Sequence, residues 1–526
     1  MRTDDAGLFI GLAQLSIPRD VRRIRTEGWS RHGLGAAEYI ADDKADAALA
    51  REHPRFCTAT ANGRHFRLEA ADGAIAVEQA GARGDPAADN AHDDQPAFQA
   101  AVDYAAAFAL PRITLAQPLY SIRCPERYLD PRADHRTLDG RPIVLHPGQR
   151  IAFVGTGTEP SRLAFRSRGG HSFGGNQPGR AFQVVDGKVW RGSGFYLPGA
   201  ERVDLSKGSL TGPKAQRLRL ERLVVDGGTK RTANSAPGAD PRTGDGWDVT
   251  HKGIWSELDR EGWDIEIVDC SFTGWRGETV YASNDPGATL TVRNSEFAHS
   301  NAQGLNTAGC MVDVGGARIE DCFIGIEGWM GARGGRIVAT EIVDCFGKKG
   351  IGGSGSAFAL QGGRYGKSER SRYYAPTEVD PGEAPWGTLD ITCRNSRPAY
   401  AGSWLKGRLR LVDTALFLGS PAVFGEGARH VDLRVELVTD RTTDAFVLLA
   451  GGDGQPGDML TDDVALDIVS SATPLAEAEN LRPAAPLVWR GSFGPNVAAR
   501  VSGRAASLPP GPEGKVPDHA PRIERR

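Results

Sequence analysis

The stretch "IVDCSFTGWRGETVYA" at 267–282 decides the fold, because looser copies of its opening recur downstream. Each copy has an apolar residue, then Asp or Asn two positions later, and then Cys or Ser. A repeat of about 25 residues with strand-like apolar positions is typical of a solenoid. The Cys or Ser positions are spaced by 25, 27 and 23 residues, at Cys270, Ser295, Cys322 and Cys345.

The repeat favours a coil of parallel strands over a leucine-rich repeat, because the Leu/Asn signature and helical periodicity are missing. Each turn of such a coil stacks about 4.8 Å above the last, so like residues form columns. With seven Cys and no CxxC pair, we predict that Cys270, Cys322 and Cys345 are free, buried and stacked on one another. A ladder of hydrogen-bonded turns is expected at Asp226, Asp269, Asp321 and Asp344.

The composition restricts the classes of partner that we expect for the protein. Gly accounts for 67 of 526 residues, nearly twice the usual share of roughly 7%, which indicates many turns between short strands. The net charge of −3 gives no basic field that would draw the chain to nucleic acid. No run of about 20 apolar residues occurs, so no membrane insertion is expected.

Three regions are predicted along the chain. Residues 1–75 form a small head, either a docking subdomain or a simple N-terminal cap, with a hairpin turn at Asn62-Gly63. Residues 76–506 form the coil. The Pro-rich segment 507–526 is expected to be a flexible tail without a fold of its own.

Two loops are expected to project over the side of the coil, where solenoids carry binding surfaces. The polar segment 229–245 interrupts a coil whose spacing is otherwise normal. Residues 362–386 interleave positive charges with aromatic rings, a combination suited to an anionic polysaccharide. The residues of this second loop that we expect to bind are Arg364, Arg370, Arg372 and Tyr373.

An amphipathic helix is predicted at the entrance to the coil. Phe98, Ala101 and Val102 begin its apolar face, Asp94 can cap its N-terminus and Pro96 suits its first turn. Such a helix would cover the open edge of the first coil.

The same passage, "GARGDPAADNAHDDQPAFQAAVDYA" at 81–105, resembles the "GAxGDGxxDDTxAIQxAI" opening of pectate-lyase-like proteins. It departs from that pattern by an insertion before Asp93 and by Pro96. The resemblance implies an all-β, right-handed parallel β-helix of about 10–13 coils, with an N-terminal capping helix. The superfamily includes polysaccharide lyases, glycoside hydrolases and phage tailspike-type depolymerases.

Candidate site residues emerge when "KGIW" (252–255), "ETVY" (278–281) and "QGLN" (303–306) are stacked. Alternation turns Ile254, Val280 and Leu305 inward. The outward column, on which sugar rings could pack, is Trp255, Tyr281 and Asn306.

Lys252, Glu278 and Gln303 stack at the turn edge of the same strands, so the strands are expected to begin after them. Lys252 and Glu278 form either a plain ion pair or a catalytic carboxylate tuned by a lysine. Glu327 is expected two coils above Glu278, about 9–10 Å away, close to the spacing of an inverting carboxylate pair.

Together these features predict an enzyme that depolymerises an acidic extracellular or surface polysaccharide of bacteria. Hydrolysis would use Glu278 with Glu327, whereas β-elimination would need Lys252, His251 or Tyr281 as base. No calcium cage is recognisable, so no metal and no cofactor are expected, which favours hydrolysis or metal-independent elimination. The further substrate-binding residues expected are Gln303, Arg276 and Trp329.

The alternative is a non-catalytic glycan-binding or phage tail-fibre protein on the same solenoid. We expect a monomer or homotrimer that is extracellular, periplasmic or part of a virion. The start of the chain has acidic residues where a signal peptide carries positive charge, so either a signal was removed or export uses another route. A cytoplasmic location stays open as the alternative.

Overall fold

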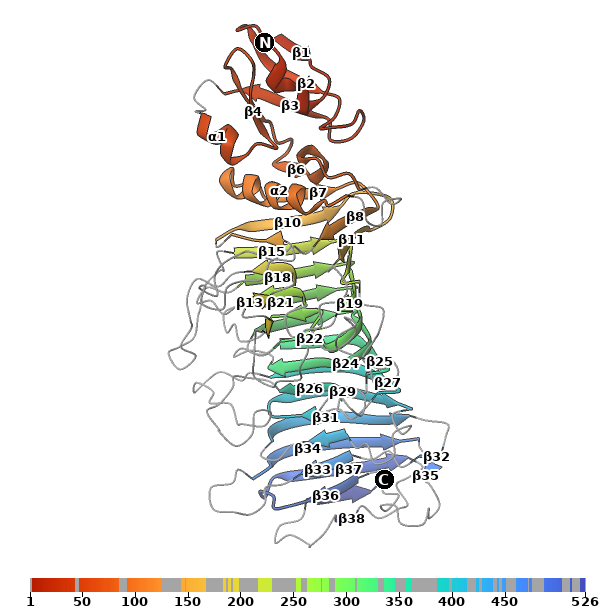
Figure 1. Ribbon diagram of the computed structural model, residues 1–526. Helices are drawn as coiled ribbons and strands as arrows, with labels where there is room; N and C mark the ends of the chain where they lie inside the picture. The colour runs from red at the N-terminus through yellow and green to blue at the C-terminus, as the bar shows by residue number, and fades with distance from the viewer. Residues whose placement is uncertain are drawn as a thin grey trace.

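A computed structural model shows a tall stack of strand coils with a small domain at its N-terminal end (Figure 1). The structure describes residues 2–42, 47–84, 92–123, 143–146, 148–166, 183–185, 188–190, 193–197, 216–228, 252–256, 263–275, 277–282, 289–307, 310–329, 335–345, 356–361, 386–396, 400–413, 422–424, 428–438, 442–443, 447–450, 460–471, 473–474, 487–503, 511–512 and 521–525.

The N-terminal head is a five-stranded sheet in the order β1-β2-β3-β5-β4. The predicted hairpin is confirmed, because β4 and β5 pair antiparallel and Gly63 takes the left-handed φ of 75° that its turn requires. The elements of the head are β1 (Arg2–Asp5), η1 (Phe9–Gln14), β2 (Val21–Thr26), β3 (Ala37–Ala41), α1 (Ala47–Glu52), β4 (Cys57–Ala59) and β5 (His65–Leu68).

The predicted capping helix is α2 (Gln95–Ala107), preceded by the short helix η2 (Val77–Ala80). It lies between the head and the first coil (Figure 1), and its apolar face, including Phe98 and Val102, is fully buried. Asp94 precedes the helix but does not cap it with its side chain. Its carboxylate instead accepts hydrogen bonds from the backbone N–H groups of Arg83 at 2.7 Å and Ser121 at 3.1 Å.

The coils form a right-handed parallel β-helix, as predicted, and their strands stack in three columns that we call faces 1, 2 and 3. The strands of face 1 are β6 (Ala74–Ala76), β7 (Arg112–Leu115), β10 (Arg150–Gly155), β15 (Gln216–Glu221), β18 (Trp263–Val268), β21 (Thr289–Arg293), β23 (Met311–Gly315), β25 (Gly335–Val343), β27 (Gly387–Arg394), β29 (Leu405–Val412), β31 (Arg429–Val438), β34 (Asp462–Ser470), β37 (Val497–Gly503) and β39 (Arg522–Arg525).

Faces 2 and 3 complete the earlier coils, and the long strands β22 and β24 run through both of them. From β25 onward the strand of face 1 also continues face 2, because residues 341–343 of β25 pair with residues 318–320 of β24. Face 2 holds β8 (Leu119–Arg123), β11 (Ser161–Arg166), β16 (Leu223–Asp226), β19 (Ser271–Trp275), β22 (Glu296–Asn306) and β24 (Arg318–Trp329). Face 3 holds β9 (Ile143–Val144), β14 (Ser193–Leu197), β17 (Lys252–Ser256), β20 (Val280–Tyr281), the ends of β22 and β24, β26 (Ser356–Gln361), β28 (Tyr400–Ala401), β30 (Ala422–Phe424), β33 (Val447–Ala450), β36 (Leu487–Arg490) and β38 (Gly511–Pro512).

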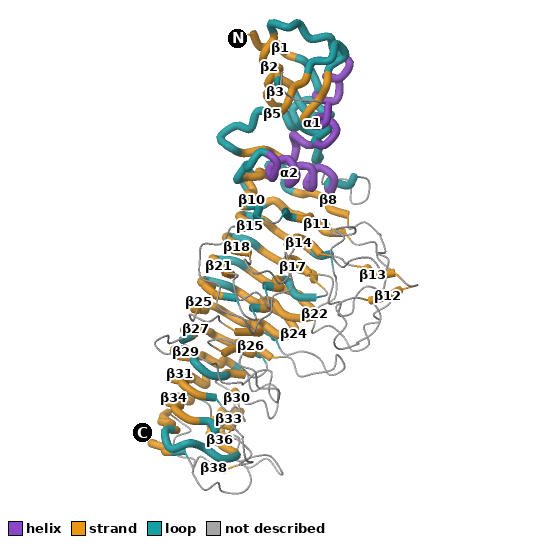
Figure 2. Tube along the Cα trace, turned by 90° about the vertical axis from the view of Figure 1, so that its left-hand side faces the viewer, coloured by secondary structure: helices purple, strands orange, loops and turns teal. Residues whose placement is uncertain are grey.

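Two short strand pairs lie outside these faces: β12 (Gln183–Val185) with β13 (Lys188–Trp190), and β32 (Thr442–Thr443) with β35 (Thr473–Pro474). Figure 2 shows the first pair well to the side of the stack.

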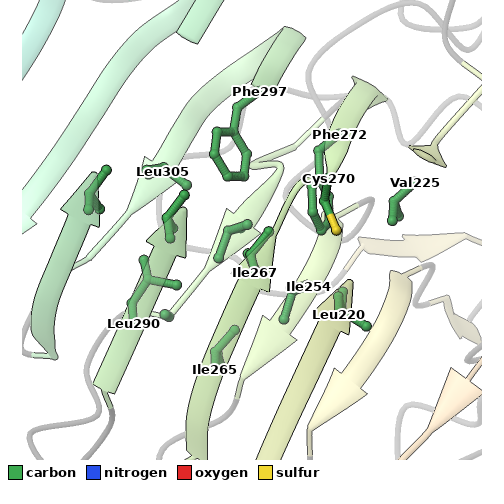
Figure 3. Close-up of a cluster of buried hydrophobic side chains, with 14 of the residues drawn as sticks. Leu220, Val225, Ile254, Ile265, Ile267, Cys270, Phe272, Leu290, Phe297 and Leu305 are labelled. Carbon is green, nitrogen blue, oxygen red and sulfur yellow. The ribbon is translucent and has the colours of Figure 1, made fainter. Parts of the chain in front are cut away.

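Inward side chains from all three faces fill the interior (Figure 3). The predicted inward column is confirmed, because Ile254 pairs with Val280, Val280 pairs with Leu305, and all three are fully buried. Similar apolar columns run through the rest of the stack, so the core is continuous along the coils.

The corners of the coil hold the predicted turn ladder, with one correction to its register. Asp269 and Asn294 stack as expected and adopt left-handed φ values of 50° and 47°, a conformation that Asp and Asn tolerate. Cys322, however, pairs with Ser300, so Asp321 lies at the next corner of the coil. Both corners place a polar residue before a small buried one, and the sequence pattern therefore could not separate them.

Two further residues occupy positions other than those that the sequence alignment predicted. Asp226 pairs with Thr273 inside face 2, and Arg222 occupies the corner that the sequence assigned to Asp226. Cys270 therefore lies against Ser295, whose Oγ accepts its N–H, rather than against another cysteine.

The predicted state of the three thiols is confirmed, since Cys270, Cys322 and Cys345 are free and buried. Stacking holds for Cys322 and Cys345, whose thiols are neighbours. Burial raises the pKa of Cys270 to about 12.

The segment 507–526 is not without structure, contrary to the sequence prediction. Strand β39 adds to the edge of β37, and the short β38 adds to β36. Backbone hydrogen bonds to an existing strand edge are independent of side-chain pattern, so the charged composition of β39 did not reveal it. No helix among the described residues is long and apolar enough to cross a membrane.

Candidate active site

The outward column predicted on face 3 exists and contains a fourth member. Trp255 pairs with Tyr281, Tyr281 with Asn306, and Asn306 with Glu327. Glu327 therefore lies two coils above the coil of Glu278, as the sequence predicts, and it shares the column of Tyr281.

A column of small residues interrupts the alternation just before these positions. A Cβ on Gly253 would come within 2.4 Å of the carbonyl oxygen of Thr279 and 2.9 Å of the Phe272 ring. Gly304 and Gly325 repeat this close approach on later coils. These glycines face the core, and so does the residue that follows each of them. The inward–outward alternation of the strand therefore shifts by one residue at this column.

The restart turns Lys252 outward, although simple parity would bury it in the core. The Lys252 ammonium lies 4.0 Å from the ring centroid of Tyr281 and 5.8 Å from that of Trp255. It also forms an ion pair with the carboxylate of Glu278 on the next coil. The sequence expectation that the strands begin after Lys252, Glu278 and Gln303 holds only at Glu278, because β17 begins at Lys252 itself and β22 includes Gln303.

This ion pair is almost completely shielded from water. The side chains of Lys252 and Glu278 are only 2% and 7% exposed. An ammonium that contacts both a carboxylate and an aromatic face satisfies two attractions at once, which offsets part of the cost of removing it from water.

The second carboxylate of the face has a different partner. Gln303 donates a hydrogen bond from Nε2 to Oε2 of Glu327, and both residues are half-buried. Glu327 thus meets a neutral amide, whereas Glu278 meets a cation. Two carboxylates in different settings on one face are the arrangement that acid–base chemistry requires.

The aromatic residues of the column differ in exposure. Tyr281 is half-buried, but Trp255 is only 7% exposed because it packs with Val144 and Tyr281. The Trp255 ring is therefore not the open sugar platform that the sequence suggested. Asn306 is also buried, at 9%.

Several predicted residues lie outside the described part of the chain. Trp329 belongs to β24, but its side chain is not described. The others outside the description are His251, Arg276, Arg364, Arg370, Arg372, Tyr373, loop 229–245 and loop 362–386 up to its last residue. Sequence reasoning missed the small-residue column, which the shared second position of "KGIW", "QGLN" and "IGIE" could have revealed.

No protein-family description and no curated protein sequence matches the chain. Among solved structures, it is similar to the gp42 tailspike of an Acinetobacter phage, with 12% identity, a TM-score of 0.40 and coverage of 97% of this chain and 76% of that one. It is also similar to the A-module of the Azotobacter vinelandii mannuronan C-5 epimerase AlgE4, with 11% identity, a TM-score of 0.42 and coverage of 86% and 99%.

A third similar structure is WceF of Pantoea stewartii, a glycan biofilm modifying enzyme, with 11% identity, a TM-score of 0.31 and coverage of 88% of this chain and 50% of that one. The strand order, the parallel pairing and the capped first coil make this chain a right-handed parallel β-helix.

Proposed function

We propose that the protein depolymerises an acidic polysaccharide by hydrolysis, with Glu278 and Glu327 as the two catalytic carboxylates. The observation that carries this proposal is their unequal environment, with Lys252 on Glu278 and Gln303 on Glu327. Glu278, paired with a cation, suits the carboxylate that activates water. Glu327, held by a neutral amide and half-exposed, suits the acid that protonates the leaving oxygen.

The spacing of the two residues favours inversion at the anomeric carbon. Two coil steps separate their backbones by about 10 Å. The hydrogen bond from Gln303, on the intermediate coil, draws the Glu327 carboxylate back toward Glu278. The resulting separation suits the range of roughly 6.5–9.5 Å that leaves room for a water molecule.

One observation favours a second candidate, metal-independent β-elimination. The Lys252 ammonium lies 4.0 Å from the Tyr281 ring, where it would stabilise a phenolate acting as base on a uronate. Lys252 itself is a poor candidate for the base, because it is ion-paired and its side chain is 2% exposed. A polysaccharide substrate in either case places the protein outside the cell or on a virion.

Product analysis on acidic polysaccharides tests the proposal. We expect new reducing ends without the ultraviolet absorbance of an unsaturated uronate, and an inverted anomer as first product by NMR. Glu327→Gln should lower the rate at least about 100-fold, while Glu296→Gln, an exposed carboxylate on face 2, should not.

Each alternative has its own result. Unsaturated products that disappear in Tyr281→Phe but persist in Glu327→Gln would establish elimination. Binding without any product would establish a non-catalytic glycan-binding protein.

A further inference from the structure

A row of side chains occupies one corner of four successive coils, directly before strands β27 and β29 and at the second residue of strands β31 and β34. The register places Trp386, Trp404, His430 and Asp463 directly above one another. We call the first three residues the corner ridge. They lie where the strands of face 1 begin, at the corner that the chain reaches immediately after face 3 in each coil.

The rings of the corner ridge pack on one another while staying half-exposed. The ring centroids of Trp386 and Trp404 are 5.5 Å apart, and those of Trp404 and His430 are 3.9 Å apart. All three residues are half-buried, and His430 Nδ1 is 2.5 Å from a carboxylate oxygen of Asp463. The ridge is therefore a preformed aromatic surface that still reaches solvent.

The backbone conformation at the corner ridge is one that bulky side chains rarely adopt. Trp404 and His430 have left-handed φ values of 60° and 59°, a conformation that is unusual for a bulky side chain. Elsewhere in the stack, Asn294 and Asn395 occupy left-handed corners, and Asn adopts this conformation readily. A tryptophan held in an unfavourable backbone conformation points to a role for its exposed ring.

The charge beside the ridge indicates the kind of ligand. The ammonium of Lys406 lies 5.7 Å from the ring centroid of Trp386, and Lys406 is exposed. An aromatic surface offers the apolar C–H groups of a sugar a place to pack, and a neighbouring cation attracts a carboxylate.

We propose that the corner ridge is a distal subsite that binds the acidic glycan several sugar units away from the cleavage point. The inference rests on the proposed function and extends its site along the stack. Trp404 follows Tyr400, which stands two coils above Glu327 in the same face 3 column. Four coil steps, about 19 Å, separate Tyr281 from the coil of Trp404, so only a long chain reaches both.

Affinity electrophoresis in gels containing polygalacturonate, alginate or xanthan tests the subsite. The parent is Glu327→Gln, so that the polymer is not consumed. Trp404→Asn suits the left-handed corner and should leave the thermal midpoint unchanged or higher, yet weaken retention about tenfold, the scale of an aromatic contact. Lys406→Gln should weaken retention in these acidic polymers. His299→Asn, at a left-handed corner between faces 2 and 3, is the matched control and should bind like the parent.

The outcomes separate the two proposals. Unchanged retention of Trp404→Asn, with retention lost in Tyr281→Ala, overturns the subsite and leaves the proposed function. Loss in Trp404→Asn with none in Tyr281→Ala supports the subsite and overturns the proposed site on face 3. A lower thermal midpoint in Trp404→Asn with unchanged retention would assign the ridge to packing. No retention of the parent in any acidic polymer overturns both.

Discussion

Because the Lys252–Glu278 pair is buried, removing one of its two charges should destabilise the protein more than removing both. With side chains 2% and 7% exposed, either charge left without the other would be shielded from water. Lys252→Met should therefore lower the free energy of unfolding by about 3 kcal/mol, and adding Glu278→Gln should restore part of it.

Denaturant unfolding of both single variants and the double variant measures this coupling. The matched control is Arg500→Met, which breaks an exposed pair with Glu524 and should cost about 1 kcal/mol or less. Equal losses of unfolding free energy in Lys252→Met and Arg500→Met would contradict the prediction that breaking the buried pair costs more.

A second residue, His299, couples stability to pH. Its hydrogen bond to Asp321 raises the pKa of the imidazole above 6.5. The protonated form is thus favoured in the folded state, so the added stability is complete below 6.5 and disappears as the pH rises through the raised pKa. The thermal midpoint of the wild type should exceed that of His299→Asn more at about one pH unit below 6.5 than at two units above. The same difference at both pH values would show that the pair does not titrate as described.

At the level of the strand, the small-residue column decides where side chains of face 3 point. Gly253→Ala would place a methyl group 2.4 Å from the carbonyl oxygen of Thr279. We expect a loss of about 1–3 kcal/mol in the free energy of unfolding, together with weaker catalysis, because Lys252 and Glu278 shift with the strand.

The control for this substitution is Gly11→Ala in the head, where nothing lies within 4 Å of the added carbon. It should change stability by no more than about 0.5 kcal/mol. If Gly253→Ala leaves the free energy of unfolding unchanged, the strand adjusts to the added methyl group without cost.

The sequence predicts the columns of face 3 well, because Ile254, Val280 and Leu305 recur at nearly constant spacing with strict alternation after them. It fails at Asp321, since two corners of one coil share the same Asp-then-small pattern. It also gives no hint of the corner ridge. Trp404 and His430 occupy left-handed positions that no propensity rule assigns to them, and their spacing follows loops of unequal length.

On the scale of the whole molecule, α2 joins the head to the stack. Its Tyr104 ring stacks on Phe56 of the head at 4.5 Å, and its hydroxyl donates to the carbonyl of Leu68 at 2.9 Å. Tyr104→Ala should remove this contact and loosen the head before the coils, because most of the core lies below α2.

Hydrogen exchange resolves that prediction by element. Amides of β2, β3 and β5 should lose protection in Tyr104→Ala, while those of β29 and β31 keep theirs. Uniform loss across head and coils would show instead that the two parts unfold as one unit.

The constant rise of the coils has a consequence for how such a protein measures length. Every position on the stack is a whole number of steps of about 4.8 Å from any other in its column. The molecule is in effect a ruler, graduated by its backbone. Inserting one complete coil between Ala359 and Tyr400 would move Trp404 one graduation away while Glu327 keeps its paired neighbours Asn306 and Ala359, since each coil contacts only those next to it.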